Sequence, residues 1–349
     1  IDLGKDCSTA EVNPLFSDSV YIDRLSRIPA VMEMPYNDIV RKFIDMYAGR
    51  LRNQVSFMLS ACNFYMPIFE EALDAYGLPL ELKYLPIIES ALNPSAVSRA
   101  GASGLWQFMI GTGKIYGLES NSLIDERRDP IKATWAAARY LKEMYDIYGD
   151  WNLVIAAYNC GPGTINKAIR RAGGETDYWK IYNLLPKETR GYVPAFIAAN
   201  YVMTYYCDHN ICPMETNIPA STDTVQVTQN LHFEQIAELC NVPLDEVKSL
   251  NPQYKKQIIP GTTKPCTLRL PQGAISAFID KQDTIYAHRA DELFRNRKTV
   301  AVKEITPATR RQTSAIAGKG KLTYYKIKSG DTLSSIAEKL GVRVRDIQQ

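Results

Sequence analysis

Apolar residues recur at helical spacing through most of the first 206 positions of this chain of 349 residues. Asn37 is a good N-cap for one such segment, and Asp129 followed by Pro130 starts another, which Gly149 ends. The pattern predicts two helices before residue 62 and about eight after it, with no strand among them. The predicted helices cover residues 20–28, 37–60, 65–76, 80–92, 105–115, 129–148, 150–159, 164–172, 178–185 and 188–206.

The pattern changes after residue 213. Strand-like VQV at 225–227 precedes two helical segments, 233–240 and 244–250, and strand-like TLRLP follows at 267–271. Residues 324–349 repeat the order of strand, turn and helix, and stop just after a second helix begins. The sequence therefore predicts a βααβ unit of roughly fifty residues and a truncated second copy of it.

These changes in pattern predict a mainly α fold class and divide the chain into five parts. Residues 297–320 are rich in Lys, Arg, Thr, Ala and Gly, as flexible linkers are. The expected parts are an N-terminal leader with a helical extension at 1–62, an all-helical domain at 63–215, a βααβ module at 216–272, a helical segment with a flexible linker at 273–320, and the truncated module at 321–349.

One carboxylate stands on a predicted helix that is apolar almost all round. Positions 82, 85, 89 and 92 share a helix face, where Glu89 stands among leucines. Asn93-Pro94 is expected to end the helix, because the residue before a proline is disfavoured in the α region. A buried, unpaired carboxyl group has a raised pKa and can act as a general acid near neutral pH. The alternative is a structural glutamate paired with a buried Arg or Lys.

The segment after this helix, 95–104, is a loop rich in Ser, Ala and Gly. Gly101, Ala102 and Gly104 predict a close approach of the backbone to another group.

Charge and chain ends narrow the function classes further. A net charge of +3 is too small to indicate nucleic-acid binding, and no apolar run reaches the ~18 residues that span a bilayer. The first residues have neither a basic start nor an apolar core, so we expect no signal peptide here; the absence of an initial Met favours its removal.

The cysteines and histidines argue against a metal. Seven cysteines and three histidines occur without a CxxC motif, so we expect no metal site and no cofactor. Cys207 could pair with Cys212, and Cys240 with Cys266, or these residues are small buried thiols.

An ordered set of motifs surrounds Glu89. The motifs are Glu89-Ser90, Asn93-Pro94, Ser98, GASGLWQFM at 101–109, AYNCG at 157–161 and Tyr192-Val193-Pro194. In this order they resemble the motifs of the soluble-type lytic transglycosylases, which cleave bacterial peptidoglycan and are related in fold to goose-type lysozyme. The resemblance covers roughly residues 63–206 and implies a lysozyme-like catalytic domain there.

The βααβ units resemble lysin motifs (LysM), which are small carbohydrate-binding modules. A catalytic domain followed by such modules resembles the membrane-bound D-type group of these enzymes. In the 216–272 module, Gln229-Asn230-Leu231 stands where lysin motifs usually have Gly-Asp-Thr, so a spacer role is an alternative to glycan binding. The terminal copy keeps Ser329-Gly330-Asp331-Thr332-Leu333 and is the better candidate for binding.

The resemblance implies that Glu89 is the single catalytic acid and base. It would protonate the glycosidic oxygen between N-acetylmuramic acid (MurNAc) and N-acetylglucosamine (GlcNAc). No second carboxylate occurs in the motifs, so a substrate-assisted route to a 1,6-anhydroMurNAc product fits better than a two-carboxylate scheme. Six further residues would bind substrate or support the site: Ser98 at the N-acetyl group or the reacting hydroxyl, Gln107 and Tyr158 at the sugar, Met109 in the cleft wall, Asn159 as a brace, and Tyr192 through a hydrogen bond to Glu89.

Several of these residues have a plain structural alternative. Ser98 could be a turn serine, Met109 and Tyr158 core residues, and Tyr192 an aromatic staple at a helix start. Cys160 stands where relatives commonly have a small or polar residue, and we interpret it as a packing substitution.

Two other functions stay open at this point. The same fold could hydrolyse peptidoglycan, as goose-type lysozyme does, with Asp125 or Asp129 activating a water molecule. The helical domain could instead bind glycan without catalysis.

The resemblance also implies a setting. We expect a monomer whose partner is the glycan strand of peptidoglycan, with no nucleic acid, in the periplasm or cell envelope of a Gram-negative bacterium. Membrane association would require a lipid anchor upstream of Ile1, since Cys7 is not at the start.

Overall fold

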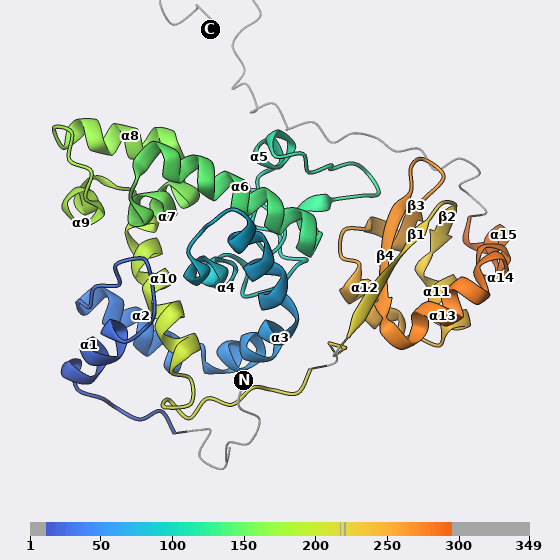
Figure 1. The fold of residues 1–349 in the computed structure, drawn as a ribbon, viewed down its shortest axis with the longest axis horizontal. Coiled ribbons are helices and arrows are strands. Elements are labelled where there is room, and N and C mark those ends of the chain that lie inside the picture. The colour runs from blue at the N-terminus through green and yellow to red at the C-terminus, as the bar shows by residue number, and fades with distance from the viewer. Residues whose placement is uncertain (1–11, 217, 220, 295–349) are drawn as a thin grey trace, which may run out of the picture. The chain divides into compact units, whose positions relative to one another are not determined.

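The computed structural model describes residues 12–216, 218–219 and 221–294, all within one compact unit that covers residues 1–307. The predicted linker at 297–320 and the module at 321–349 lie outside the described residues, as does Cys7. The described part is mainly α-helical, with short antiparallel strands only towards its C-terminal end, so the predicted fold class is confirmed (Figure 1).

Three helices open the chain: α1 (Asp18–Ser26), α2 (Asp38–Ala48) and α3 (Arg52–Ala75). Asn37 caps α2 as predicted, because its Oδ1 accepts hydrogen bonds from the amides of Ile39 and Val40, each at 3.0 Å. The single helix predicted for 37–60 is wrong. The chain breaks at Gly49, where a Cβ atom would lie 2.8 Å from a backbone oxygen, and α3 then continues through the predicted gap at 61–64.

The segment that carries Glu89 is shorter than predicted. A 3₁₀ turn (Leu80–Tyr84) leads into α4 (Leu85–Ser90), and Ala91 and Leu92 then adopt left-handed backbone angles, with φ of 52° and 59°. The helix therefore ends before Asn93-Pro94. The helix predicted from residue 105 is likewise a loop up to Met109, followed by α5 (Ile110–Ile115).

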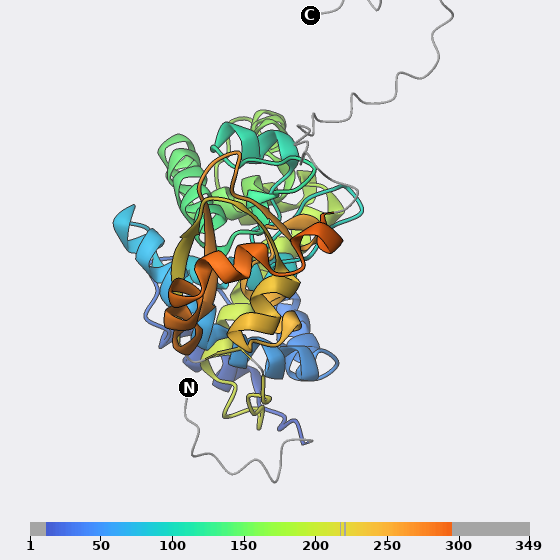
Figure 2. The ribbon, with the colours of Figure 1, turned by 90° about the vertical axis from the view of Figure 1, so that its right-hand side faces the viewer.

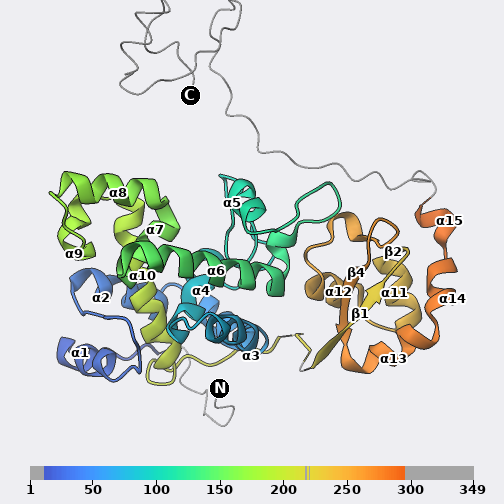
Figure 3. The same ribbon diagram turned by 45° about the horizontal axis from the view of Figure 1, so that its top comes forward.

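Longer helices complete this part of the fold. They are α6 (Pro130–Tyr148), α7 (Trp151–Cys160), α8 (Pro162–Arg171), α9 (Tyr178–Ile181) and α10 (Lys187–Thr204), with 3₁₀ turns at Glu126–Arg128 and Tyr182–Leu184. Asp129 caps α6 and Gly149 ends it with φ of 63°, both as predicted. Helix α10 packs against α2, α4 and α7, and α6 packs against α3 and α7. Figures 1 and 3 show the short α4 lying among α3, α6 and α10.

The predicted βααβ unit is present. Strand β1 (Thr222–Val227) pairs antiparallel with β4 (Cys266–Pro271), with Thr222 opposite Pro271 and Val227 opposite Cys266. A second antiparallel pair joins β2 (Asn230–His232) to β3 (Ile258–Pro260). The helices α11 (Phe233–Cys240) and α12 (Leu244–Leu250) lie between them in sequence, and α13 (Gln272–Asp280), α14 (Gln282–Ala287) and α15 (Ala290–Leu293) follow; Figure 2 shows this module face on.

The module packs directly onto the loop that precedes α6. The Asp125 amide donates to the Gln253 carbonyl (2.8 Å), and the Lys255 amide donates to the Leu123 carbonyl (2.6 Å). Leu123 and Ile124 belong to the hydrophobic core of the module. Both hydrogen bonds and apolar packing therefore hold the module against this loop of the helical part.

Both predicted disulfides are wrong, because Cys207, Cys240 and Cys266 are free thiols. Cys240 and Cys266 are buried, which fits the alternative of small packing residues. None of the described helices combines the length and the apolar character needed to cross a membrane. Within the same residues, no group of three or more His, Cys, Asp or Glu side chains could hold a metal ion.

Candidate active site

Glu89 opens into a cavity of about 420 Å³. One part of its lining comes from α4 and the loop after it, through residues 87–91 and 96–98 together with Gln107. The other part comes from α2 and α3, through Tyr47, Leu51, Gln54 and Met58. Glu89, Ser98 and Gln107, which the sequence predicts as site residues, are thus brought together.

Glu89 is half-buried, and its environment suits a carboxylic acid rather than a carboxylate. Burial raises the pKa of Glu89 to about 7, the hydrogen bond from Tyr192 lowers it, and the negative charge of Glu188 raises it. No Arg or Lys forms an ion pair with Glu89 in the described part of the chain, so the structural alternative of a charge-paired glutamate is not supported. Near neutral pH this group can both give and take a proton.

Tyr192 reaches Glu89 from the first turns of α10. Its hydroxyl donates a hydrogen bond to Oε1 of Glu89. Burial raises the pKa of Tyr192 well above its ordinary value, so the phenol keeps its proton and acts as a donor. The predicted contact between these two residues is present in the structure.

The loop 96–108 holds its shape through its own backbone. The Ser98 hydroxyl oxygen accepts a hydrogen bond from the Ala102 amide (3.0 Å). Gln107 has a left-handed backbone, with φ of 48°, and its Nε2 donates to the Gly104 carbonyl (2.9 Å). The amide oxygen of Gln107 is therefore the atom of this side chain that is left to accept a hydrogen bond from a ligand.

Arg127 holds this loop in place, although no motif in the sequence indicates it. Its side chain is buried, forms a two-point ion pair with Asp125, and donates through Nη1 to the carbonyls of Gly101 (2.9 Å) and Phe108 (3.0 Å). Gly104 touches the same residue: a Cβ atom there would lie 1.8 Å from the Arg127 carbonyl oxygen. The predicted close approach is thus real at Gly104, whereas a Cβ at Gly101 would meet nothing within 4 Å.

Like Tyr192, three further predicted site residues do not line the Glu89 cavity. The Tyr158 hydroxyl donates to the Trp106 carbonyl (2.7 Å), next to Gln107, and the Asn159 Oδ1 accepts from the Thr189 hydroxyl (2.9 Å). Both contacts support neighbouring segments. Met109 is 46% exposed and precedes α5.

The two aspartates considered for hydrolysis are engaged elsewhere. Asp125 is buried and paired with Arg127, and Asp129 accepts hydrogen bonds from the amides of Ile131 and Lys132 as the cap of α6. Neither lines the cavity at Glu89. Glu188, exposed at the start of α10, is the carboxylate whose charge acts on Glu89, and the motifs did not point to it.

Sequence reasoning also missed the contribution of α2 and α3. Tyr47 stands at helical spacing among apolar residues, as a core residue would, and Gln54 belongs to no motif. Spacing along one helix predicts which residues share a face, but not which remote segment that face meets.

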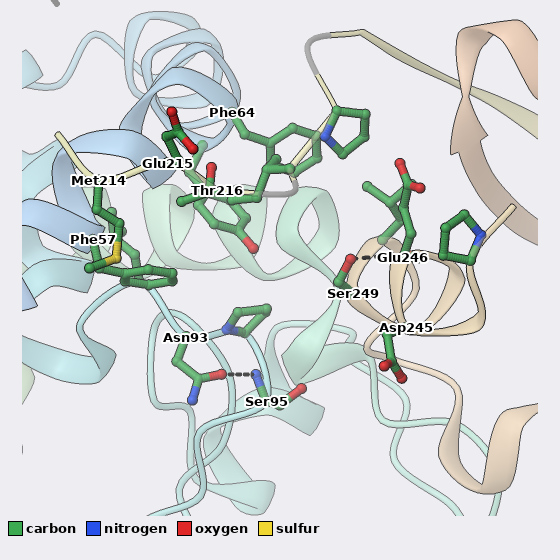
Figure 4. Close-up of a pocket in the computed structure, with 17 residues that line it drawn as sticks. Phe57, Phe64, Asn93, Ser95, Met214, Glu215, Thr216, Asp245, Glu246 and Ser249 are labelled. Atoms are coloured by element: carbon green, nitrogen blue, oxygen red, sulfur yellow. Dashed lines mark hydrogen bonds between the residues drawn. The ribbon is translucent and has the colours of Figure 1, made fainter.

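A larger cavity of about 1170 Å³ lies next to the turn that follows α4 (Figure 4). Its apolar lining includes Phe57, Phe64 and Met214, and its polar lining includes Asp245 and Glu246 at the start of α12. Among the described residues, the two cavities share no lining residue. None of the predicted site residues faces this larger space.

Three family models match separate parts of the chain. Residues 66–181 match the family model "Transglycosylase SLT domain", and residues 221–287 match "Lytic transglycosylase MltD, LysM-like domain". Residues 325–349, outside the described part, match "LysM domain".

The similar proteins carry related names. Membrane-bound lytic murein transglycosylase D of Escherichia coli (strain K12) is 30% identical over 324 residues, which are 91% of this chain and 66% of that protein. Soluble lytic murein transglycosylase of the same strain is 33% identical over 124 residues, 34% of this chain and 19% of that protein. The crystal structure of a 70 kDa soluble lytic transglycosylase from Escherichia coli is 28% identical, with a TM-score of 0.36, over 44% of this chain and 26% of that one. The chain thus spans 66% of the length of the first relative and less of the others.

Proposed function

The chain belongs to the family of proteins that join a transglycosylase SLT domain to LysM-type domains, and on that premise we propose that it is a lytic transglycosylase of bacterial peptidoglycan. Its substrate is the glycan strand, and the bond cleaved is the β-1,4 bond from MurNAc to GlcNAc. The proposed domain boundaries are 1–62, 63–215, 216–272, 273–320 and 321–349, with catalysis in 63–215.

Glu89 is the observation that carries the proposal. It is the only carboxylate among the described residues that line the cavity, and its pKa of about 7 keeps a substantial fraction of it protonated near neutral pH. In the first step Glu89 donates its proton to the glycosidic oxygen, and the bond from that oxygen to C1 of MurNAc breaks. The N-acetyl group of the same sugar stabilises the positive charge at C1.

In the second step the same group acts as a base. The Glu89 carboxylate takes the proton from the C6 hydroxyl of MurNAc, and that oxygen attacks C1 to form the 1,6-anhydro ring. Glu89 is protonated again and no water is consumed, so one carboxylate is sufficient. Tyr192, as a neutral donor, stabilises the carboxylate between the two steps.

The remaining site residues take the roles their contacts favour. Ser98 and the amide oxygen of Gln107 bind polar groups of the sugar, since both side chains face the cavity. Tyr158 and Asn159 position the loop and α10, and Met109 offers an exposed apolar contact to the strand. The 216–272 module serves as a brace for the catalytic part, in a monomer of the periplasm or envelope that an upstream lipid anchor could hold at the membrane.

Mass spectrometry of the products from purified peptidoglycan tests the proposal. We expect muropeptides lighter by one water than hydrolysed ones, and no turnover by Glu89→Gln. Turnover that survives Glu89→Gln would contradict the catalytic assignment, and stable glycan binding by a wild type without turnover would favour the non-catalytic scaffold.

Hydrolysis by the same fold is the second candidate. Glu188 is the observation that favours testing it, because a second carboxylate could activate water from the far side of the sugar. Products that carry the mass of one added water, and that disappear with Glu188→Gln, would support hydrolysis over transglycosylation.

A further inference from the structure

Helix α2 is built into the catalytic site from outside the matched SLT region, which begins at residue 66. It packs along α10, the helix that carries Tyr192. The contact is tight at Gly191, where a Cβ atom would lie 3.1 Å from the ring of Phe43. Tyr47 follows Phe43 by four positions and so lies on the same helix face, directed at the same end of α10.

The Tyr47 hydroxyl has no hydrogen-bond partner among the residues that the structure describes. Its side chain is 7% exposed and lines the Glu89 cavity. Among the described residues no group forms a hydrogen bond with this hydroxyl, and its effect is felt at Tyr192, whose pKa is raised by burial first and by Glu89 and Tyr47 in addition. This oxygen is not among the fully buried atoms that lack a partner, so it is open to the cavity, where a ligand can reach it.

Gln54 offers a second open polar group in the same cavity. It stands in the first turn of α3 and is exposed, and its amide has no hydrogen-bond partner in the described part of the chain. Leu51 and Met58 supply apolar surface beside it. An apolar surface with a few convergent polar groups is the usual composition of a site that fixes the orientation of a ligand.

We propose that Tyr47 and Gln54 form a sugar-binding subsite next to Glu89, which holds hydroxyl and acetamido groups of the glycan residue beside the bond that is cleaved. The phenol donates or accepts one hydrogen bond, and the amide does both. Ser98 and Gln107 line one wall of the cavity, from the loop after α4. Tyr47 and Gln54 line the other wall, from α2 and α3. The inference rests on the proposed function for the identity of the ligand.

The test uses the full chain and soluble glycan strands of defined length made of alternating GlcNAc and MurNAc. We expect Tyr47→Phe and Gln54→Ala each to raise KM or lower kcat/KM roughly tenfold, the loss of one or two ligand hydrogen bonds. Without ligand, the Tyr47→Phe variant should unfold at the same temperature as the wild type or at a higher one, because the change removes no hydrogen bond among the described residues.

Tyr65→Phe is the matched control. Tyr65 is also a buried tyrosine on α3, 5% exposed, but it does not line the Glu89 cavity. The proposed subsite would be overturned if Tyr47→Phe and Gln54→Ala both left kcat/KM unchanged. It would also be overturned if their loss of activity were matched by a loss of thermal stability.

Binding to the inactive Glu89→Gln protein separates this inference from the proposed function. If the wild type fails to cleave glycan, the proposed function fails. The subsite survives that result only if Glu89→Gln binds the strands and the added Tyr47→Phe change weakens binding roughly tenfold; binding unaffected by the change would overturn it.

Discussion

The hydroxyl of Tyr192 donates a hydrogen bond to the carboxylate of Glu89, from a position 103 residues later in the chain. The bond stabilises the ionised carboxylate and lowers its pKa, while burial raises it more strongly, to about 7. The contact needs both the early end of α4 and the start of α10, so the acid strength of Glu89 depends on how these helices pack.

Tyr192→Phe is expected to make Glu89 a weaker acid. The variant loses the interaction that lowers the pKa, so Glu89 stays protonated to a higher pH. In the proposed mechanism the protonated form starts the reaction, so the alkaline limb of the pH–rate profile should move to higher pH, with a lower maximal rate. Initial rates on soluble glycan between roughly pH 5 and 9 measure the position of this limb, because Glu89 titrates near neutral pH. An alkaline limb that stays in place would show that Tyr192 does not tune Glu89.

Glu188→Gln is expected to have the opposite effect on the same limb. The negative charge of Glu188 raises the pKa of Glu89, so its removal should shift the alkaline limb to lower pH. Glu188 is exposed, and salt should therefore produce part of this shift in the wild type and none in the variant. Glu143→Gln, an exposed carboxylate on α6 that pairs with Arg139, is the control and should leave the limb unchanged.

The helices with local start and stop signals could be predicted from the sequence. Asp129 with Pro130 and Gly149 delimit α6 through contacts made within a few residues, and Asn37 caps α2 in the same way. The break at Gly49 could not be predicted, because the helical pattern continues across it and α3 keeps its helix through Pro67.

The site was predictable only where a motif carried it. Glu89, Ser98, Gln107 and Tyr192 belong to an ordered set, and three of them line one cavity while Tyr192 bonds to Glu89. Arg127 follows no motif, since its partners are backbone carbonyls, which any sequence provides. Tyr47 is hidden for another reason: an aromatic residue on an apolar helix face has the same pattern in a core as in a cavity wall.

Two glycines with the same backbone angle give a matched test of the loop at Gln107. Gly101 and Gly104 both have φ of 89°, but only at Gly104 would a Cβ atom collide with the Arg127 carbonyl, at 1.8 Å. Both alanine variants should carry the strain of a left-handed residue, about 1–2 kcal/mol. Gly104→Ala should lose further stability and most of its kcat/KM, because the loop must move away from Arg127. Equal urea midpoints and equal activities in the two variants would contradict this.

Glu89→Gln should stabilise the protein at alkaline pH but not in acid. In the folded protein the pKa of Glu89, about 7, lies above the ordinary pKa of a glutamate. The free energy of unfolding of the wild type therefore falls as the pH rises from that ordinary pKa towards 7, and is not reduced at lower pH. The difference between variant and wild type in the free energy of unfolding should grow from near zero at low pH to at most about 3 kcal/mol above pH 7. Urea unfolding at several pH values measures it, and a pH-independent difference would mean that burial does not raise the pKa of Glu89.

Arg127→Leu should be the most destabilising single change around the site. The substitution leaves Asp125 buried without its two-point partner and removes the donors to the Gly101 and Phe108 carbonyls, so we expect a loss of about 3–5 kcal/mol in the free energy of unfolding. Catalysis should fall as well, since the braced loop carries Gln107. Lys142→Ala is the control: its side chain is 42% exposed and pairs with Asp146, which is 58% exposed, so its loss should cost about 0–1 kcal/mol and leave kcat/KM unchanged. If the two variants lost equal stability, the ion pair of Arg127 would be no more than a surface contact, and the brace under the loop would have to be sought elsewhere.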